Sequence, residues 1–186
     1  EKMVEPQEEM DRWILSRTSS LVQKVEEAME RYALDEATEL FIPFFDELTN
    51  WYIRRNRRRF WSDEESLSRQ EAFSTLYIVF KTCIKTLAPF APYITDLIWS
   101  NLRRPEEPIS VHLTSFPDPT ALYRNEELER AHTAAQTVTT LGHALRKELK
   151  MKVRQPLAKA FVAVSDPLWQ KALLPVLESI RDDLNV

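Results

Sequence analysis

The sequence contains very little glycine: Gly142 is the single glycine among 186 residues. All-β folds and nucleotide-binding α/β folds use glycine at tight turns and where the backbone approaches phosphate, so this scarcity favours helices joined by proline-containing turns. It also excludes a P-loop and a dinucleotide-binding fingerprint, since each motif needs several glycines. The composition therefore predicts a mainly α-helical fold.

Cysteine and histidine are equally scarce. A single cysteine, Cys83, excludes an internal disulfide and a cysteine-based zinc site. His112, His132 and His143 lie far apart in the sequence, and no two of them have metal-ligand spacing on one helix. No nucleophile is accompanied by a base and an orienting group. We expect no catalytic site, no metal and no cofactor in this chain, and a reduced, cytoplasmic protein.

Long apolar runs and a signal peptide are also missing. No segment approaches the roughly 18–20 apolar residues of a membrane span. The chain begins with Glu-Lys and stops at Leu-Asn-Val without a polar tail. We interpret it as an excised piece of a longer protein, monomeric and without a membrane partner.

Apolar residues recur every three or four positions along most of the chain, which is typical of amphipathic helices. The pattern predicts helices over about 8–32, 36–59, 68–87, 92–104, 125–150 and 167–185. Pro43 predicts a kink in the second of these helices. Ser68 and Glu71 have the spacing of a capping box. The predicted core faces include Tyr32, then Phe73 and Phe80, then Ile94, Leu97 and Ile98, and finally Leu141, Leu145 and Leu149.

The fold class expected is mainly α, an antiparallel helix bundle followed by the start of a small α/β piece. The bundle would span 1–150, with a proline-rich connection at 105–122, and a truncated α/β appendage would span 151–186. Ala160–Val164 is apolar and β-branched and predicts a strand. Its partner would be either beyond Val186 or within 109–113, because one strand alone is not stable. Gly142, in mid-helix, predicts a close contact there.

The most unusual stretch is 50–61, which reads Asn-Trp-Tyr-Ile-Arg-Arg-Asn-Arg-Arg-Arg-Phe-Trp. Because the net charge of the chain is −4, the residues outside its five arginines carry −9. A basic patch interleaved with aromatic residues on an acidic protein indicates a nucleic-acid partner. The alternative is a solvated helix end whose charge is neutralised by nearby carboxylates: Asp46, Glu47, Asp63, Glu64 and Glu65.

The predicted core face of the second helix changes from apolar to cationic after Trp51. Arg55, and then Arg58 or Arg59, continue the spacing of Phe44, Leu48 and Trp51. A buried arginine without a partner is costly, so the helix must either leave the core near Trp51 or meet buried acids. In the second case, Arg55 would be the buried partner of an acid such as Asp96.

A second, weaker basic cluster follows the fifth predicted helix. It comprises Arg146, Lys147, Lys150, Lys152 and Arg154. The alternative is that these cations only complement the C-terminal end of the helix dipole.

Several segments together resemble one known family. The stretch at 50–61 resembles the signature of the anticodon-binding region of isoleucyl-tRNA synthetases, which are class I aminoacyl-tRNA synthetases. Asp11–Arg17, Leu87–Tyr93, Ser110–Leu113 and Lys152–Leu157 resemble further segments of that region, in the same order.

The resemblance implies a tRNA anticodon-arm binding module within a parent that ligates isoleucine to its tRNA with ATP. It also implies that the catalytic domain, and any ATP or zinc, lie outside this chain, and that other domains of the parent are partners. The competing hypothesis is a protein-interaction or scaffolding bundle that docks on acidic partners. The RNA-binding residues expected are Arg54, Arg57, Arg58, Arg59, Trp61, Arg146, Lys147, Lys150, Lys152 and Arg154, with Trp61 as a base-stacking residue.

Overall fold

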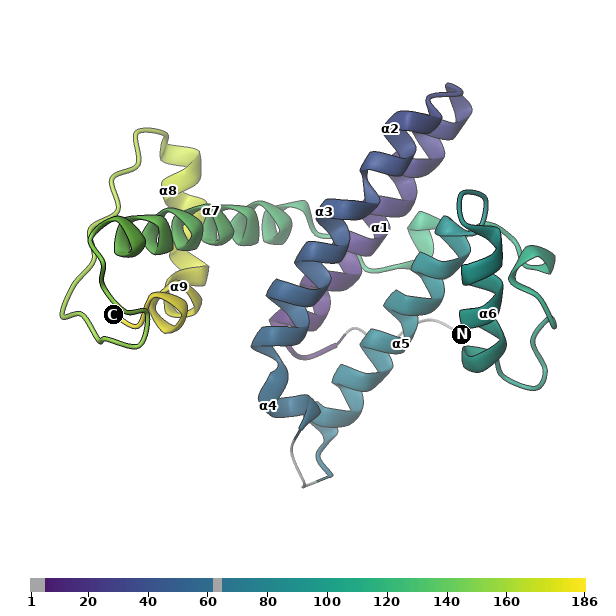
Figure 1. Ribbon diagram of the computed structural model, residues 1–186, viewed down its shortest axis with the longest axis horizontal. Coiled ribbons are helices and arrows are strands. Elements are labelled where there is room, and N and C mark those ends of the chain that lie inside the picture. The colour runs from purple at the N-terminus through teal and green to yellow at the C-terminus, as the bar shows by residue number, and fades with distance from the viewer. Residues whose placement is uncertain (1–5, 62–64) are drawn as a thin grey trace. The chain divides into compact units, whose positions relative to one another are not determined.

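The computed structural model describes residues 6–61 and 65–186, and it divides the chain into two compact units (Figure 1). Unit 1 is Glu1–Arg124 and unit 2 is Asn125–Val186. This division falls before the fifth predicted helix rather than after it at 150. The reason is that the fifth helix packs against the elements that follow it.

Unit 1 is a helical bundle in which α5 and the segment α2–α3 pack against α1, and α6 packs against α5 (Figure 1). A π-helix, η1, continues α3 and leads to the four-residue helix α4. Two single-turn 3₁₀ helices, η2 and η3, lie in the proline-rich connection. The elements are α1 (Glu9–Glu30), α2 (Leu34–Glu39), α3 (Phe41–Asp46), η1 (Glu47–Ile53), α4 (Arg57–Phe60), α5 (Leu67–Leu87), α6 (Pro92–Leu102), η2 (Val111–Leu113) and η3 (Pro119–Ala121).

Unit 2 consists of one long helix with two shorter ones against it. The elements are α7 (Glu126–Glu148), α8 (Pro167–Leu173), the 3₁₀ helix η4 (Leu174–Val176) and α9 (Leu177–Leu184), with α8, η4 and α9 all contacting α7. Asn125 and Asp166 cap α7 and α8, each accepting a backbone N–H with its side chain. The mainly α-helical class is confirmed.

The predicted strand at 160–164 is wrong. Across the described residues, neither this segment nor 109–113 forms a strand, and Val111–Leu113 is a 3₁₀ turn instead. Phe161 is 93% exposed. An extended segment gains ladder hydrogen bonds only beside a partner, so a β-branched run on its own stays irregular.

The predicted core face of the second helix is confirmed from Ala37 to Trp51. Ala37, Phe41, Phe44 and Leu48 are buried against the bundle. The break that Pro43 predicts is present, because α2 ends at Glu39 and α3 begins at Phe41. The π-helix was not predicted. In it, the Arg54 N–H donates to the carbonyl of Thr49, five residues back, which shifts the phase of the residues that follow.

Two other predicted core faces, those of α5 and α6, are partly wrong. On α5 the buried positions are Ala72, Thr75, Val79, Cys83, Ile84 and Thr86, whereas Phe73 and Phe80 are exposed. Small residues allow α1 and α5 to approach closely, so they occupy the contact and the larger rings turn outward. On α6, Thr95 and Trp99 face inward, and the indole Nε1 of Trp99 donates to the carbonyl of Pro108; the apolar residues Ile94, Leu97 and Ile98 are exposed.

Helix ends account for two further differences. α1 ends at Glu30, and Tyr32 lies beyond it with a φ of 57° and 90% exposure, so it is not a core residue. The N–H groups of Tyr32 and Ala33 donate to Met29 and Ala28, which is a Schellman motif with tyrosine where glycine is usual. The cap of α5 is Ser66, whose hydroxyl accepts from the Arg69 N–H, and not Ser68.

Gly142 makes the close contact predicted for it. A Cβ at this position would lie 2.5 Å from Cδ2 of Leu184, so α9 packs directly on the α7 backbone. Leu141, Leu145 and Leu149 are exposed rather than buried. They line an apolar groove of about 490 Å³ that also includes Phe161 and Val162.

Candidate nucleic-acid interface

The basic stretch of 50–61 lies at the end of the α3–η1 arm, where the chain turns through α4 toward α5. Arg54, Arg57 and Arg58 are exposed, and Trp61 is 66% exposed directly after α4. We call these four residues the cationic tip. A four-residue helix gains too little from its own hydrogen bonds to be stable alone, so the side chains that are not exposed must hold it.

Two aromatic rings lie under guanidinium groups in this stretch. The guanidinium carbon of Arg55 is 3.8 Å from the centre of the Trp51 ring, and that of Arg57 is 5.7 Å from the Trp61 ring. Trp51 is buried, so the pair with Arg55 belongs to the bundle. The pair of Arg57 and Trp61 is exposed, and it presents a cation beside an accessible aromatic face.

Arg59 has a different environment from the cationic tip. Its guanidinium forms a two-pronged ion pair with Asp11, with Nη1 2.9 Å from Oδ1 and Nη2 2.8 Å from Oδ2. Nε donates to the Ser68 hydroxyl, Nη2 to the Ser68 carbonyl, and Nη1 to the Asn56 side chain. These contacts use all five N–H donors that an arginine possesses. We therefore leave Arg59 out of the residues that reach RNA.

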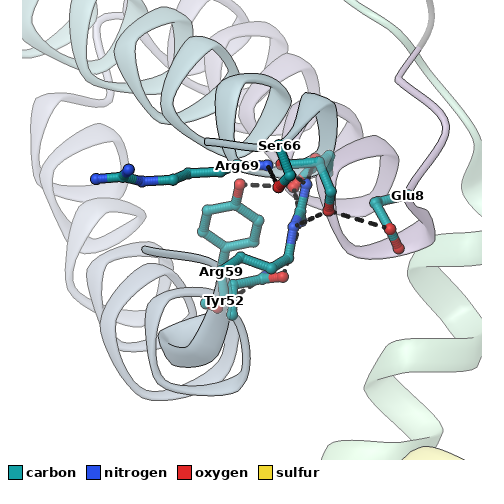
Figure 2. Close-up of polar contacts among 8 residues, drawn as sticks. Glu8, Tyr52, Arg59, Ser66 and Arg69 are labelled. Atoms are coloured by element: carbon teal, nitrogen blue, oxygen red, sulfur yellow. Dashed lines mark hydrogen bonds and ion pairs between the residues drawn. The ribbon is translucent and has the colours of Figure 1, made fainter. Parts of the chain in front are cut away.

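The carboxylate that receives Arg59 is fully buried. Asp11, near the start of α1, has no exposed side-chain surface, and the Tyr52 hydroxyl donates to its Oδ1 at 2.7 Å. Burial, followed by the negative charge of Asp11, raises the pKa of Tyr52 far above its ordinary value, so the phenol stays a neutral donor. Figure 2 shows Arg59 and Tyr52 meeting at this site, with Glu8 at its edge.

The sequence indicated that an arginine of this stretch would need a buried acid. Such a pair is present, but it joins Arg59 to Asp11 rather than Arg55 to Asp96. Asp11 receives Arg59, whereas Asp96 accepts from the Ser110 hydroxyl and the Val111 N–H. The spacing of the arginines indicated that an acid was needed. It did not indicate Asp11, because the two residues are 48 positions apart.

The carboxylates proposed as neutralising partners are mostly engaged elsewhere or lie outside the described residues. Asp46 accepts from the Asn50 side chain, and Glu47 forms an ion pair with Arg17 at 2.9 Å. Asp63 and Glu64 lie outside the described residues.

The second basic cluster lies at the C-terminal end of α7 in unit 2. Arg146 is buried, and its Nη groups donate to the carbonyls of Lys152, Gln155 and Leu184. Its guanidinium therefore ties the end of α7 to the end of α9. We leave Arg146 out of the residues that reach RNA. The exposed members of the cluster are Lys147, Lys150, Lys152 and Arg154.

The described residues contain no group of three or more His, Cys, Asp or Glu side chains placed to hold a metal ion. In the same residues, no helix has the length and apolar character needed to cross a bilayer.

Comparisons with known proteins agree with this geometry. Residues 11–162 match the family described as the anticodon-binding domain of tRNA ligase. The chain is 48% identical to an isoleucine–tRNA ligase of Protochlamydia amoebophila over 97% of its length, and 46% identical to that of Chlamydia trachomatis over 96%. An isoleucine–tRNA ligase of Treponema pallidum is 40% identical over 95% of the chain.

The chain spans only 16–17% of the length of these relatives. The family match covers most of the chain and contains the cationic tip, the buried ion pair behind it and the second basic cluster. The chain therefore belongs to the anticodon-binding domain family of tRNA ligases.

Proposed function

We propose that this chain binds the anticodon arm of an isoleucine-accepting tRNA, as part of a longer protein that joins isoleucine to that tRNA using ATP. The observation that carries the proposal is the cationic tip: Arg54, Arg57 and Arg58 are exposed together with Trp61 on a protein of net negative charge. The ligation chemistry, with its ATP and any zinc, belongs to the rest of the longer protein.

Each part of the tip has a separate role in the proposal. The arginines contact phosphates, which supplies affinity that falls steeply with salt. The Trp61 ring stacks on an unpaired base of the anticodon loop, because RNA sequence is recognised mainly through splayed single-stranded bases. Lys147, Lys150, Lys152 and Arg154 provide further phosphate contacts from unit 2. The protein acts as a monomer in the cytoplasm.

The proposal is tested by the affinity of the 186-residue chain for the anticodon stem-loop of an isoleucine tRNA at several salt concentrations. Arg54→Glu/Arg57→Glu should weaken binding at least about tenfold and reduce the salt slope by about two, one for each lost phosphate contact. The matched control is Lys24→Glu/Arg31→Glu on the α1 side, both exposed, which changes the net charge by the same amount. Equal losses in the two variants would contradict the proposal.

Stacking is tested separately. Trp61→Ala should weaken binding of the stem-loop by about 1–3 kcal/mol, the usual value of one base–aromatic stack. It should leave binding of a plain RNA duplex unchanged, because a duplex offers no unpaired base. Trp169→Ala, at an exposed tryptophan of unit 2, is the control. A Trp61→Ala variant that loses affinity for the duplex and the stem-loop alike would contradict the stacking role.

A second role is supported by the outward face of α6. Tyr93, Ile94, Leu97 and Ile98 form an exposed apolar stripe on this helix, and the relatives are about six times longer than the chain. We propose that this stripe contacts another domain of the longer protein. The amides of α6 should exchange with solvent more slowly in the full-length protein than in this chain. Equal exchange rates would contradict this contact.

A further inference from the structure

The cationic tip depends on side chains that do not themselves face solvent. Of the four residues of α4, Arg57 and Arg58 are exposed, whereas Phe60 is buried. Phe60 packs between the rings of Tyr52 and Phe73, at centroid distances of 6.1 and 5.3 Å. Arg59 supplies the polar anchor. The short helix is therefore held by one ring and one guanidinium.

The Arg59 anchor connects four segments of unit 1, one of which, the start of α1, is 48 positions away in the sequence. Asp11 comes from α1, Tyr52 from η1, Asn56 from the turn before α4, and Ser68 from the first turn of α5. Asn56 also donates to the Tyr52 carbonyl at 3.0 Å, which fixes the turn in which α4 begins. Figure 2 shows Arg59 and Tyr52 between these helices, with Ser66 and Arg69 at the start of α5 beside them.

We propose that Asp11 is a positioning residue for RNA binding: through Arg59 and Tyr52 it fixes α4, so that Arg57, Arg58 and Trp61 are presented as one preformed surface. The RNA part of this inference rests on the proposed function. A preformed surface loses less conformational entropy on binding than flexible arginines would, and long side chains on a frayed helix would lose that advantage.

The charge of Asp11 gives the inference an unusual test. Asp11→Asn removes one negative charge from the protein, so electrostatics alone would make a negatively charged RNA bind more tightly. A positioning role predicts weaker RNA binding instead, because asparagine cannot form the two-pronged ion pair and Arg59 is released. Glu47→Gln is the matched control: it also removes one negative charge, and it breaks another ion pair between α1 and η1, that of Arg17 and Glu47.

The experiment measures stem-loop affinity and amide hydrogen exchange on the same variants. Asp11→Asn should weaken binding about tenfold and speed exchange of the Arg59, Phe60 and Trp61 amides, which bond to Asn56 and Arg57 carbonyls. The amides of Val79 and Cys83, on the distant half of α5, should keep their protection. Glu47→Gln should bind RNA as tightly as the unsubstituted chain or slightly more tightly.

Two further variants test the same inference if Asp11→Asn unfolds unit 1. Arg59→Lys preserves the charge but cannot form the two-pronged ion pair, and Tyr52→Phe preserves the ring but removes the hydroxyl donor. Both should weaken stem-loop binding, by about tenfold and about threefold respectively, with selective loss of α4 protection.

Unchanged or tighter RNA binding by Asp11→Asn or Arg59→Lys would overturn the inference. So would uniform loss of protection across all of unit 1 in every variant. If the unsubstituted chain does not bind the stem-loop at all, the proposed function fails. Exchange at Arg59, Phe60 and Trp61 then still decides separately whether Asp11 fixes α4.

Discussion

The two basic clusters of this protein each contain one arginine that is held by internal contacts and several exposed cations, but the two internal arginines are held differently. In unit 1, Arg59 is paired with a buried carboxylate, Asp11. In unit 2, the Nη groups of Arg146 donate to the carbonyls of Lys152 and Gln155 in the loop after α7, and to that of Leu184 at the end of α9. The first arrangement ties together residues of four segments, whereas the second ties the loop after α7 to the C-terminal end of α9.

This difference explains why a count of positive residues is a poor guide to an interface. An arginine whose five donors are satisfied internally contributes charge but has no donor left for a phosphate. In both clusters it is the exposed residues that carry the proposed contacts.

The largest expected effect is on the stability of unit 2. Arg146→Met should lower its free energy of unfolding by about 3 kcal/mol, because several carbonyls lose a charged donor and become buried without one. Amide exchange in α9 reports this loss, while exchange in α1 should not change. The adjacent, exposed Lys147→Met is the control. A loss below about 1 kcal/mol would show that water replaces the guanidinium as the donor. Arg146 would then contribute less to the stability of its unit than we infer.

The next effect compares the exposed members of the two clusters. Arg57→Gln/Arg58→Gln and Lys147→Gln/Lys150→Gln remove the same charge. The first should weaken stem-loop binding about tenfold, or about 1.4 kcal/mol, and the second about threefold, because the tip combines fixed arginines with an aromatic ring. Filter binding at two salt concentrations measures both. Equal losses would mean that net charge matters and that the arrangement in α4 does not.

A smaller effect concerns the helix ends, where the scarcity of glycine has a cost. Tyr32 and Lys150 both adopt positive φ, 57° and 55°, in Schellman motifs at the ends of α1 and α7. Tyr32→Gly and Lys150→Gly should each raise stability by about 1 kcal/mol, because glycine has no Cβ to strain this conformation.

Both substitutions are measured by urea denaturation, with Tyr93→Ala as a control for loss of an exposed ring. Stem-loop binding separates the two sites. Lys150→Gly should weaken it slightly, and Tyr32→Gly should not change it. If neither substitution stabilises the protein, the left-handed conformation is not the source of strain.

The smallest expected effect is a difference in acid sensitivity. The Ser110 hydroxyl and the Val111 N–H donate to the Asp96 carboxylate and hold its pKa below the ordinary 3.8, and Thr120 acts similarly on Asp118. A depressed folded-state pKa means that the stabilisation is complete above pH 3.8 and is lost as the pH falls below it. Both residues belong to unit 1.

Asp96→Asn should therefore lower the thermal midpoint of unit 1 slightly at pH 7, and the difference should shrink below pH 3.8. Circular dichroism melts across pH 2.5–7 measure this. A difference that persists unchanged at the lowest pH would contradict a role for the ionised carboxylate.

Local sequence signals were sufficient for much of the fold. Asn125, Asp166 and Pro92 mark helix starts by their own side-chain chemistry, and Pro43 marks a break because it has no N–H. Periodicity was less reliable for choosing the buried face. On α6 it favoured Ile94, Leu97 and Ile98, but the contact with α5 is made by the face that carries Thr95 and Trp99.

At the candidate interface, too, local sequence signals identified the residues but not their tertiary partners. The arginine run and its aromatic neighbours were evident from the residues alone, as was the need for a buried acid. The identity of that acid was not evident, because Asp11 lies 48 positions before Arg59 and no local pattern around Arg59 indicates it.

By itself, the sequence determined the helical class, most helix boundaries and the presence of a basic, aromatic stretch, because these depend on residues within a few positions of one another. Tertiary structure alone decided which arginines are exposed. It also left 160–164 irregular, since a strand requires a partner that periodicity cannot supply. Burial and ion pairing depend on distant segments, so the division of the five arginines between the bundle and solvent emerges only when α1, η1, α4 and α5 pack together.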